Sequence, residues 1–425
     1  MPTLKETLAA KIPAMREEIR EIVAKYGDRV ISEVTVAQAY GGMRGVKCLV
    51  CDTSEVHPDK GLFVRGRPIG ELTDRLPEEM FFLLCTGELP DAKSLRSLQD
   101  SLRARAEVPA YVWRVLYDMP RDTHPMQMFD AAILALERES VFRQRYTEGM
   151  RKEEYWEPAF EDAMRLIAKL PGLAAGVYRI RFGKGDPVAS DPTLDWAGNY
   201  AHLLGVPDPN GDFARLLRLY LNLHCDHEAG NVSALTCHVV ASSLADPYYA
   251  VSAGLNGLAG PLHGLASQEC LAFVLEVQKE FGGVPTAEQL KEYVWSLLRS
   301  GRVVPGYGHA VLRTTDPRFI ALHKFASGLD TDDPVLRIVD LGYRVIPEVL
   351  KEHGKAKNPY PNVDAITGAL LHHFGILEVS YYTVVFGVSR VLGMLAQLIL
   401  NLAIGSPITR PKSVTTAWIK SQVEG

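Results

Sequence analysis

Asn256-Gly-Leu-Ala-Gly-Pro-Leu-His263-Gly264 separates two apolar segments that both have helical periodicity. Two glycines and a proline end the first segment, and Pro261 suits the first position of a second helix, where a missing N–H is tolerated. This places His263 in the first turn of that helix, where the helix dipole and free N–H groups disfavour a second proton on the imidazole. A neutral histidine there can donate a hydrogen bond to a developing oxyanion, although a lone histidine is more often a core residue.

The composition is that of a globular enzyme. Of the 425 residues, 47% are apolar and 23% are charged, and the net charge of -5 gives no reason to expect nucleic acid or an anionic membrane as partner. Six scattered cysteines do not form a disulfide framework and fit a reducing compartment. The longest apolar stretch, 381–404, contains Arg390, so we expect a buried helix there rather than a membrane span.

The pattern is helical from residue 78 onward, and the β signal is limited to the region before it. Short strands are predicted at 30–31, 34–36, 47–51 and 62–64. The chain shows no βαβ alternation and no internal repeat. We therefore predict an all-α, multihelical fold with a small N-terminal β element.

Three further stretches combine glycine or proline with titratable residues: His224-Cys-Asp-His227-Glu228-Ala-Gly-Asn231, Val303-Val-Pro-Gly-Tyr-Gly-His309 and Pro361-Asn-Val-Asp364. The spacing of the histidines in the first stretch allows a metal site, but no third ligand recurs at a fixed spacing. The second stretch lacks the GxGxxG and P-loop patterns, so it is either a connecting loop or a backbone surface for a flat ligand. Asp364 is either a helix N-cap or a general base whose pKa is raised by desolvation.

Arg390 lies inside the longest apolar stretch of the sequence. A guanidinium stays charged when it is buried, so Arg390 requires an anionic partner. That partner is either a carboxylate of the protein or a ligand.

Together these stretches resemble citrate synthase, and more narrowly the type found in mitochondria and in some bacteria. Residues 40–45, 226–228, 386–390 and 410–413 also resemble motifs of this family. The resemblance extends from about residue 4 to residue 420, with the motifs in the same order as in the family. The resemblance implies an almost wholly helical, two-domain homodimer. Its large domain would comprise residues 1–264 and 376–425, and its small domain residues 265–375.

The resemblance also implies a reaction, in which acetyl-CoA condenses with oxaloacetate and water to give citrate and CoA. No metal and no organic cofactor are implied. Asp364 would take a proton from the thioester methyl, and His263 would donate a hydrogen bond to the thioester oxygen. His309 would hydrogen-bond the ketone of oxaloacetate and protonate the alkoxide that forms from it. The implied oxaloacetate-binding residues are His227, Arg318, Arg390 and Arg410, the last from the partner subunit. The implied CoA-binding residues are Arg44, Val303, Val304, Gly306, Tyr307, Gly308, Lys355 and Lys357.

Three other functions remain open from the sequence. A 2-methylcitrate synthase would use propionyl-CoA with the same three catalytic residues, and the extra methylene is worth only about 1–3 kcal/mol of discrimination. A non-catalytic CoA- or carboxylate-binding homologue would be expected to lack one of those residues. A metal-dependent hydrolase would use His224 and His227.

The family type allows either a bacterial cytoplasm or a mitochondrial matrix. Because the N-terminus lacks the Arg-rich, acid-poor pattern of a transit peptide, we expect a cytoplasmic bacterial protein. The alternative is the mitochondrial matrix, with the transit peptide absent from this sequence.

Overall fold

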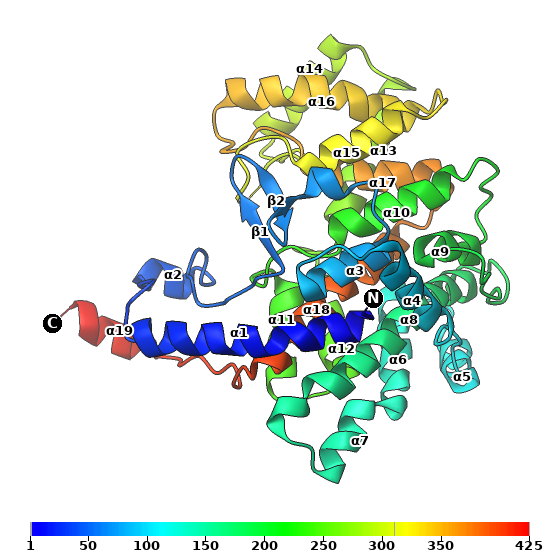
Figure 1. The fold of residues 1–425 in the computed structure, drawn as a ribbon. Coiled ribbons are helices and arrows are strands. Elements are labelled where there is room, and N and C mark those ends of the chain that lie inside the picture. Colours follow the sequence, from blue (N-terminus) through cyan, green and yellow to red (C-terminus); the bar gives the residue numbers. More distant parts are fainter. Residues whose placement is uncertain (1, 310, 425) are drawn as a thin grey trace.

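Helices make up most of the computed structural model, which describes residues 2–309 and 311–424 (Figure 1). The predicted all-α fold class is confirmed, and the strands of the described residues form one small sheet. The α-helices are α1 (Leu4–Tyr26), α2 (Val36–Tyr40), α3 (Pro77–Thr86), α4 (Ala92–Arg103), α5 (Ala110–Asp118), α6 (Pro125–Leu136), α7 (Val141–Glu148), α8 (Trp156–Arg181), α9 (Trp196–Leu204), α10 (Asp212–His224), α11 (Val232–Ser242), α12 (Pro247–Leu258), α13 (Ala266–Phe281), α14 (Ala287–Arg299), α15 (Pro317–Ser327), α16 (Pro334–His353), α17 (Asp364–His373), α18 (Tyr382–Ile404) and α19 (Thr416–Val423). The 3-10 helices are η1 (Ile69–Leu72), η2 (Glu137–Glu139), η3 (Lys152–Glu154) and η4 (Val379–Tyr381).

The sheet is a short antiparallel meander of β1 (Ser54–His57), β2 (Gly61–Val64) and β3 (Arg67–Pro68). The predicted strand at 62–64 is confirmed within β2, but those at 30–31, 34–36 and 47–51 are wrong. Residues 29–35 and 46–51 have no regular secondary structure, and Val36 begins α2. β-branched residues favour strands only where a partner segment supplies a ladder, and no described segment pairs with these residues.

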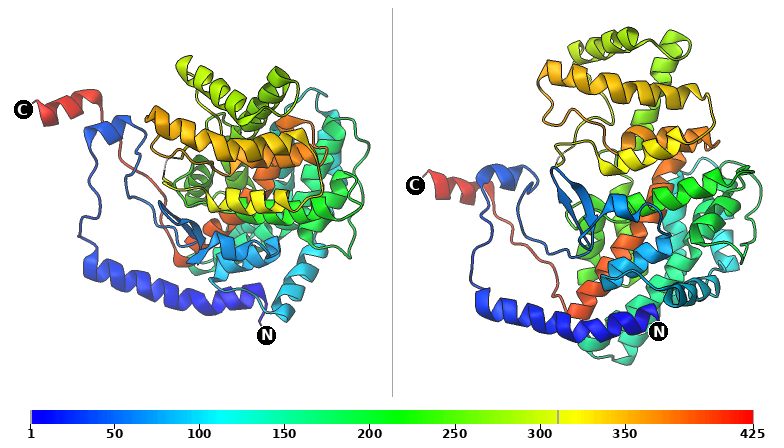
Figure 2. Two further views of the ribbon diagram at one scale, coloured as in Figure 1. Left: turned by 90° about the horizontal axis from the view of Figure 1, so that it is seen from above. Right: turned by 45° about the horizontal axis from the view of Figure 1, so that its top comes forward.

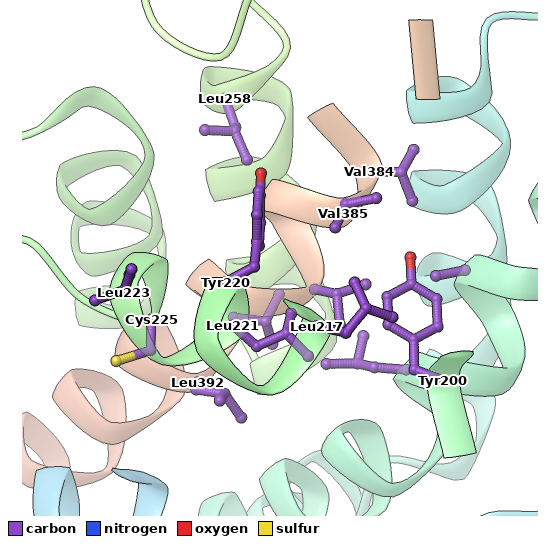
Figure 3. Packing of buried hydrophobic residues seen from close by; sticks show 14 of the residues in the cluster. Tyr200, Leu217, Tyr220, Leu221, Leu223, Cys225, Leu258, Val384, Val385 and Leu392 are labelled. Atoms are coloured by element: carbon purple, nitrogen blue, oxygen red, sulfur yellow. The ribbon is translucent and has the colours of Figure 1, made fainter. Parts of the chain in front are cut away.

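Helix α18 forms the centre of the helical body. It packs against α3, α8, α10, α11 and α12, and Figure 3 shows Val384, Val385 and Leu392 among side chains of the neighbouring helices. By length and composition the segment 379–404 could cross a membrane, but 94% of its apolar window is buried inside the protein. The prediction that this segment is a buried helix containing Arg390 is confirmed.

Helices α13 to α17 lie together at one end of the molecule (Figures 1 and 2). Helix α13 packs on α16 and α17, α14 packs on α16, and α15 contacts α10 and η1 of the remaining body. All of these helices fall within the predicted small domain, 265–375. The boundaries of that domain and of the large domain, 1–264 with 376–425, stay a prediction.

The stretch between α12 and α13 differs from the sequence prediction. Residues 260–264 form a turn of their own, in which Gly260 O accepts hydrogen bonds from His263 N (3.0 Å) and Gly264 N (3.1 Å). Helix α13 begins only at Ala266. His263 therefore precedes the helix instead of lying in its first turn, because the turn that Pro261 starts is not continued.

The two ends of the chain form an extension on one side of the body. The C-terminal end of α1, together with α2 and α19, projects beyond the other helices (Figures 1 and 2). Tyr40 Oη donates a hydrogen bond to Thr416 Oγ1 (3.0 Å), which joins the two ends. We call residues 18–50 together with 407–424 the terminal arm, and most of its described side chains are exposed.

Candidate active site

The loop that contains His309 is joined to the segment before Asp364 by backbone hydrogen bonds. Gly308 N donates to Tyr360 O (3.1 Å), and Asn362 N donates to Gly306 O (2.8 Å). The Asn362 side chain adds a third bond, from Nδ2 to Gly308 O (3.0 Å). Two stretches that are about fifty residues apart in the sequence thus form one unit.

Gly306 allows this loop to lie directly on α17. Its φ of +79° is in the left-handed region, and an added Cβ would lie 2.8 Å from both Ala365 Cα and Cys270 Sγ. Only glycine fits both the backbone conformation and the space. The loop is therefore held against the first turn of α17, which begins with Asp364.

His309 is a neutral hydrogen-bond donor. Its Nδ1 accepts hydrogen bonds from Val311 N (3.0 Å) and Leu312 N (2.9 Å), so the proton of the neutral ring is on Nε2. Burial, and next the positive charge of Arg318, hold the pKa of His309 below its ordinary value. The Nε2–H group is thus available to a substrate oxygen.

His263 has the opposite tautomer. Ser233 N, in the first turn of α11, donates to His263 Nε2 (3.2 Å), and Ser233 Oγ lies 2.9 Å from the same nitrogen. Since Nε2 accepts a bond from a backbone N–H, the ring proton is on Nδ1. Burial, and to a lesser extent Arg390, lower the pKa of His263 to about 4. The expected neutral histidine is present, but the helix end that contacts it belongs to α11 and not to α13.

Asp364 is the first residue of α17 and its side chain does not cap the helix. Its backbone N–H donates to Asn362 Oδ1 (3.0 Å), and its carboxylate accepts no hydrogen bond from the described residues. Burial raises its pKa to about 6, against the opposing effect of Arg318. A desolvated carboxylate of this kind has the properties of a general base near neutral pH.

Arg318 is buried and already paired. Its Nη2 lies 2.7 Å from Asp316 Oδ2, and its Nε lies 3.1 Å from Asp316 Oδ1. Asp316 Oδ2 also accepts a hydrogen bond from Val363 N (3.3 Å), the residue before Asp364. Burial tends to raise the pKa of Asp316, but Arg318 holds it below its ordinary value. This ion pair therefore connects the start of α15 to the start of α17.

Arg390 is buried without a carboxylate partner in the described parts of the chain. Its Nε donates to His224 O (3.1 Å), its Nη1 donates to Asn231 Oδ1 (3.3 Å), and its guanidinium lies 4.8 Å from the Phe386 ring centroid. Burial lowers its pKa to about 10, so it stays charged at neutral pH. The buried carboxylate of Asp226 opposes this lowering but forms no ion pair with Arg390, so a ligand anion fits as its direct partner.

The two histidines of the predicted metal motif have different surroundings. His224 Nδ1 lies 2.9 Å from Tyr220 O, and the ring stacks on Tyr220, so this histidine is part of the helical core. The His227 ring centroid lies 6.0 Å from that of His309. Burial, and then Arg318 and Arg390, hold the pKa of His227 well below its ordinary value. His227 therefore lies with the candidate active site, whereas the His224 side chain belongs to the core and its backbone carbonyl contacts Arg390.

The other predicted site residues divide into loop and surface positions. Val304 is buried and Val303 is exposed, while the side chain of Tyr307 packs toward Gly342 of α16. The structure brings six predicted residues together, through ring contacts and mutual electrostatic effects: His227, His263, His309, Arg318, Asp364 and Arg390. It leaves four exposed at the surface: Arg44, Lys355, Lys357 and Arg410.

Sequence reasoning did not assign four residues that organise this site: Asn231, Ser233, Asp316 and Phe386. The position of Asp316 two residues before Arg318 is a local signal that could have indicated their ion pair. The roles of the other three depend on contacts between helices that no local pattern contains.

The fold is mainly helical, and a desolvated carboxylate beside two neutral histidines and buried arginines suits an enzyme for acid–base chemistry on an anionic substrate. Residues 42–412 match the family model described as citrate synthase, C-terminal domain. The chain is 48% identical to the probable mitochondrial citrate synthase of Glossina morsitans morsitans, covering 99% of this chain and 93% of that one. It is also 48% identical to the mitochondrial citrate synthase of Saccharomyces cerevisiae, covering 99% and 90%.

A solved structure has the same fold. It is a ternary complex of carboxymethyl coenzyme A and oxaloacetate with citrate synthase from Thermoplasma acidophilum, with a TM-score of 0.75 and 23% identity, covering 91% of this chain and 96% of that one. The present chain belongs to the citrate synthase family, and it functions as a citrate synthase, an acyltransferase.

Proposed function

We propose that three side chains carry out the condensation of acetyl-CoA with oxaloacetate. Asp364 removes a proton from the thioester methyl while His263 Nδ1–H donates to the thioester oxygen, which gives an enol or enolate. The new carbon nucleophile attacks the ketone carbon of oxaloacetate, and His309 Nε2–H donates its proton to the developing alkoxide. Water then cleaves the citryl thioester to release citrate and CoA.

The observation that carries this proposal is the environment of Asp364. Its carboxylate is desolvated, has a pKa of about 6 and accepts no hydrogen bond from the described residues. The two histidines are neutral and have protons on different nitrogens, Nδ1 in His263 and Nε2 in His309. A carbon acid as weak as a thioester methyl requires such a base together with a donor at the oxygen.

Oxaloacetate has two carboxylates, which require cationic partners. Arg390 supports this assignment because it is a buried cation without a carboxylate partner in the described chain. Arg318 shares its charge with Asp316, and its remaining N–H donors can bind a second carboxylate. His227 lies beside His309 and completes the predicted set within this chain.

CoA would bind along the loop 303–308, with the exposed Val303 and the backbone of Gly306 and Gly308 facing the thioester arm. The side chain of Tyr307 packs inward, so this residue would contribute its backbone. The exposed cations Arg44, Lys355 and Lys357 suit the phosphates of the nucleotide end. Because side chains transfer every proton in this scheme, the proposal includes no metal and no organic cofactor.

A second copy of this chain would cover the terminal arm. The arm exposes large apolar side chains, among them Ile31 at 78%, Val50 at 83% and Trp418 at 51% exposure, which suggests a partner surface. Arg410 is exposed in the extended segment after α18, which is anchored where Thr409 Oγ1 lies 2.8 Å from His238 Nε2. In an isologous homodimer each chain would donate Arg410 to its partner's oxaloacetate site.

The two relatives described above are mitochondrial proteins by name, which supports the mitochondrial matrix as the compartment. The expected bacterial cytoplasm receives no support from them and stays a prediction. Likewise, their names favour acetyl-CoA as the acyl donor, and no comparison favours the 2-methylcitrate alternative.

The experiment that tests this function measures free CoA released from acetyl-CoA and from propionyl-CoA, with and without oxaloacetate and in excess chelator. We expect release that requires oxaloacetate, is faster with acetyl-CoA and is unaffected by the chelator. Release without oxaloacetate would indicate a thioester hydrolase. Faster release with propionyl-CoA would indicate a 2-methylcitrate synthase.

A further inference from the structure

A cavity of about 630 Å³ lies beside α15 and outside the candidate active site. Its walls come from α10, from α15 and from η1 with the turn that follows it. Cavities of roughly 300–1,000 Å³ are typical of small-molecule sites. Arg318 and the other residues of the proposed reaction do not line it, so the cavity requires an explanation of its own.

The walls of this cavity are rich in cations. They include Arg75, Arg215, Arg218 and Lys324, whereas Asp74 is the one carboxylate among the lining residues. These four cations come from three separate elements of the chain. Their convergence places several N–H donors around one cavity, where an anionic occupant can accept them.

Three of these cations have partners and one does not. Arg218 pairs with Asp195, Arg215 with Asp212 and Arg75 with Glu79. Each guanidinium has five N–H donors, so these pairs leave donors for a ligand. Lys324 has no carboxylate within ion-pair distance in the described parts of the chain, and its ammonium is therefore free to bind an anionic group.

The same cavity has an apolar wall. Ile320 is 49% exposed, and Leu219 and Phe325 line the cavity beside it. The guanidinium of Arg215 lies 5.9 Å from the Phe325 ring centroid, so a cation and an aromatic face are adjacent. A small inorganic ion would use only the cations and would leave this wall in contact with water.

We infer that this cavity binds an organic anion, with its phosphate or carboxylate group at Lys324 and the arginines and its apolar body against Ile320 and Phe325. Helix α15 connects this site to the reaction, because Pro317 lines the cavity while the neighbouring Asp316 and Arg318 form the buried ion pair. A ligand that contacts α15 changes the affinity for oxaloacetate through this helix. The binding itself is independent of the proposed function, and only the effect on oxaloacetate rests on it.

The test uses two aromatic probes on the full-length protein, 1-naphthyl phosphate and 1-naphthoate, with inorganic phosphate as a third arm. Calorimetry measures binding to the wild type, to Lys324→Ala and to Ala321→Phe, which fills the cavity. The matched control is Lys279→Ala, which removes an exposed lysine of α13 that does not line the cavity. Steady-state kinetics measures the KM for oxaloacetate with and without the better probe.

We expect one naphthyl probe to bind more tightly than inorganic phosphate, and the better of the two identifies the anionic group. Lys324→Ala should weaken it about tenfold, as loss of a charge-assisted contact does, and Ala321→Phe should abolish it while Lys279→Ala leaves it unchanged. The KM for oxaloacetate should rise or fall about fivefold with the probe bound, within the usual range of allosteric coupling.

Equal binding by all variants, no binding of either naphthyl probe, or equal affinity for inorganic phosphate would overturn the site. An unchanged KM would overturn the coupling.

Discussion

The acid–base properties of this site depend on burial more than on ion pairing. Burial is the largest influence on the pKa of Asp364, His263 and His309, and it raises the first and lowers the other two. The pKa of Asp364, the proposed base, therefore lies close to neutral pH, while both histidines are uncharged at that pH. The two carboxylates of the site also differ, since Asp316 is ion-paired and Asp364 is not.

The proposed role of Asp364 as the base determines the pH dependence that we expect for the reaction. Its pKa is raised to about 6, and below that pH the protonated carboxyl group cannot accept the methyl proton. We expect kcat/KM for acetyl-CoA to be level above pH 7 and to fall about tenfold per pH unit well below the pKa. The pKa of His263, lowered to about 4, lies below this limb, and burial lowers the pKa of His309 as well. A flat profile down to pH 5, with the protein shown to be folded by circular dichroism, would contradict the assignment.

At the residue scale the sequence predicted the chemical groups but not their hydrogen bonds. His263, His309 and Asp364 were identifiable from their motifs. The tautomers were not, because they depend on backbone N–H groups of Ser233 in another helix and of Leu312 in a loop. The position of His263 before α13 was also missed, since a proline after glycines starts a helix or an isolated turn with the same local pattern.

At the element scale the key feature is the contact of the loop 303–309 with α17. Gly306 permits this contact, because a side chain there would meet Ala365 and Cys270. Gly301 provides a matched comparison, since its φ is also +79° but an added Cβ would meet nothing within 4 Å. The two glycines therefore separate the effect of the backbone conformation from that of the close approach.

We expect Gly306→Ala to lower the free energy of unfolding by about 2–4 kcal/mol, from the left-handed conformation together with overpacking. It should also lower kcat, because the loop positions His309. Gly301→Ala should lower the free energy of unfolding by only about 1 kcal/mol and leave kcat close to wild type. Denaturant unfolding and steady-state kinetics measure both. If the two variants behave alike, the close approach has no role in the site.

Elements differed in how far the sequence could predict them. The helices α1 and α14 were identifiable because helical periodicity and capping residues are local, and in α14 Thr286 and Gln289 form a capping box. The strands predicted at 30–31, 34–36 and 47–51 failed because a strand requires a partner segment, and no described segment pairs with these residues. The terminal arm, which contains nearly all of them, exposes β-branched residues such as Val30 and Ile31 instead.

At the scale of the whole molecule, the proposed homodimer would make each site depend on Arg410 from a second copy of the chain. If Arg410 acts in the partner's site, Asp364→Ala and Arg410→Ala homodimers are each nearly inactive. In a mixed dimer both lesions then fall in one site and the other site is intact. Random pairing after refolding an equal mixture gives about half mixed dimers, so activity should recover to about a quarter of wild type. Activity that stays at the level of the parent variants would show that Arg410 acts within its own chain.

We propose that Asp364 is the base that activates acetyl-CoA, and the Asp364→Asn variant tests this role most directly. Asparagine keeps the shape of the side chain and removes its ability to accept the methyl proton. We expect kcat to fall by about 10²–10⁴-fold, the usual contribution of a general base. We also expect the Kd for oxaloacetate, measured by calorimetry, to be nearly unchanged, because the arginines still bind its carboxylates. A variant with near wild-type kcat, or one whose loss lies mainly in oxaloacetate binding, would contradict this role.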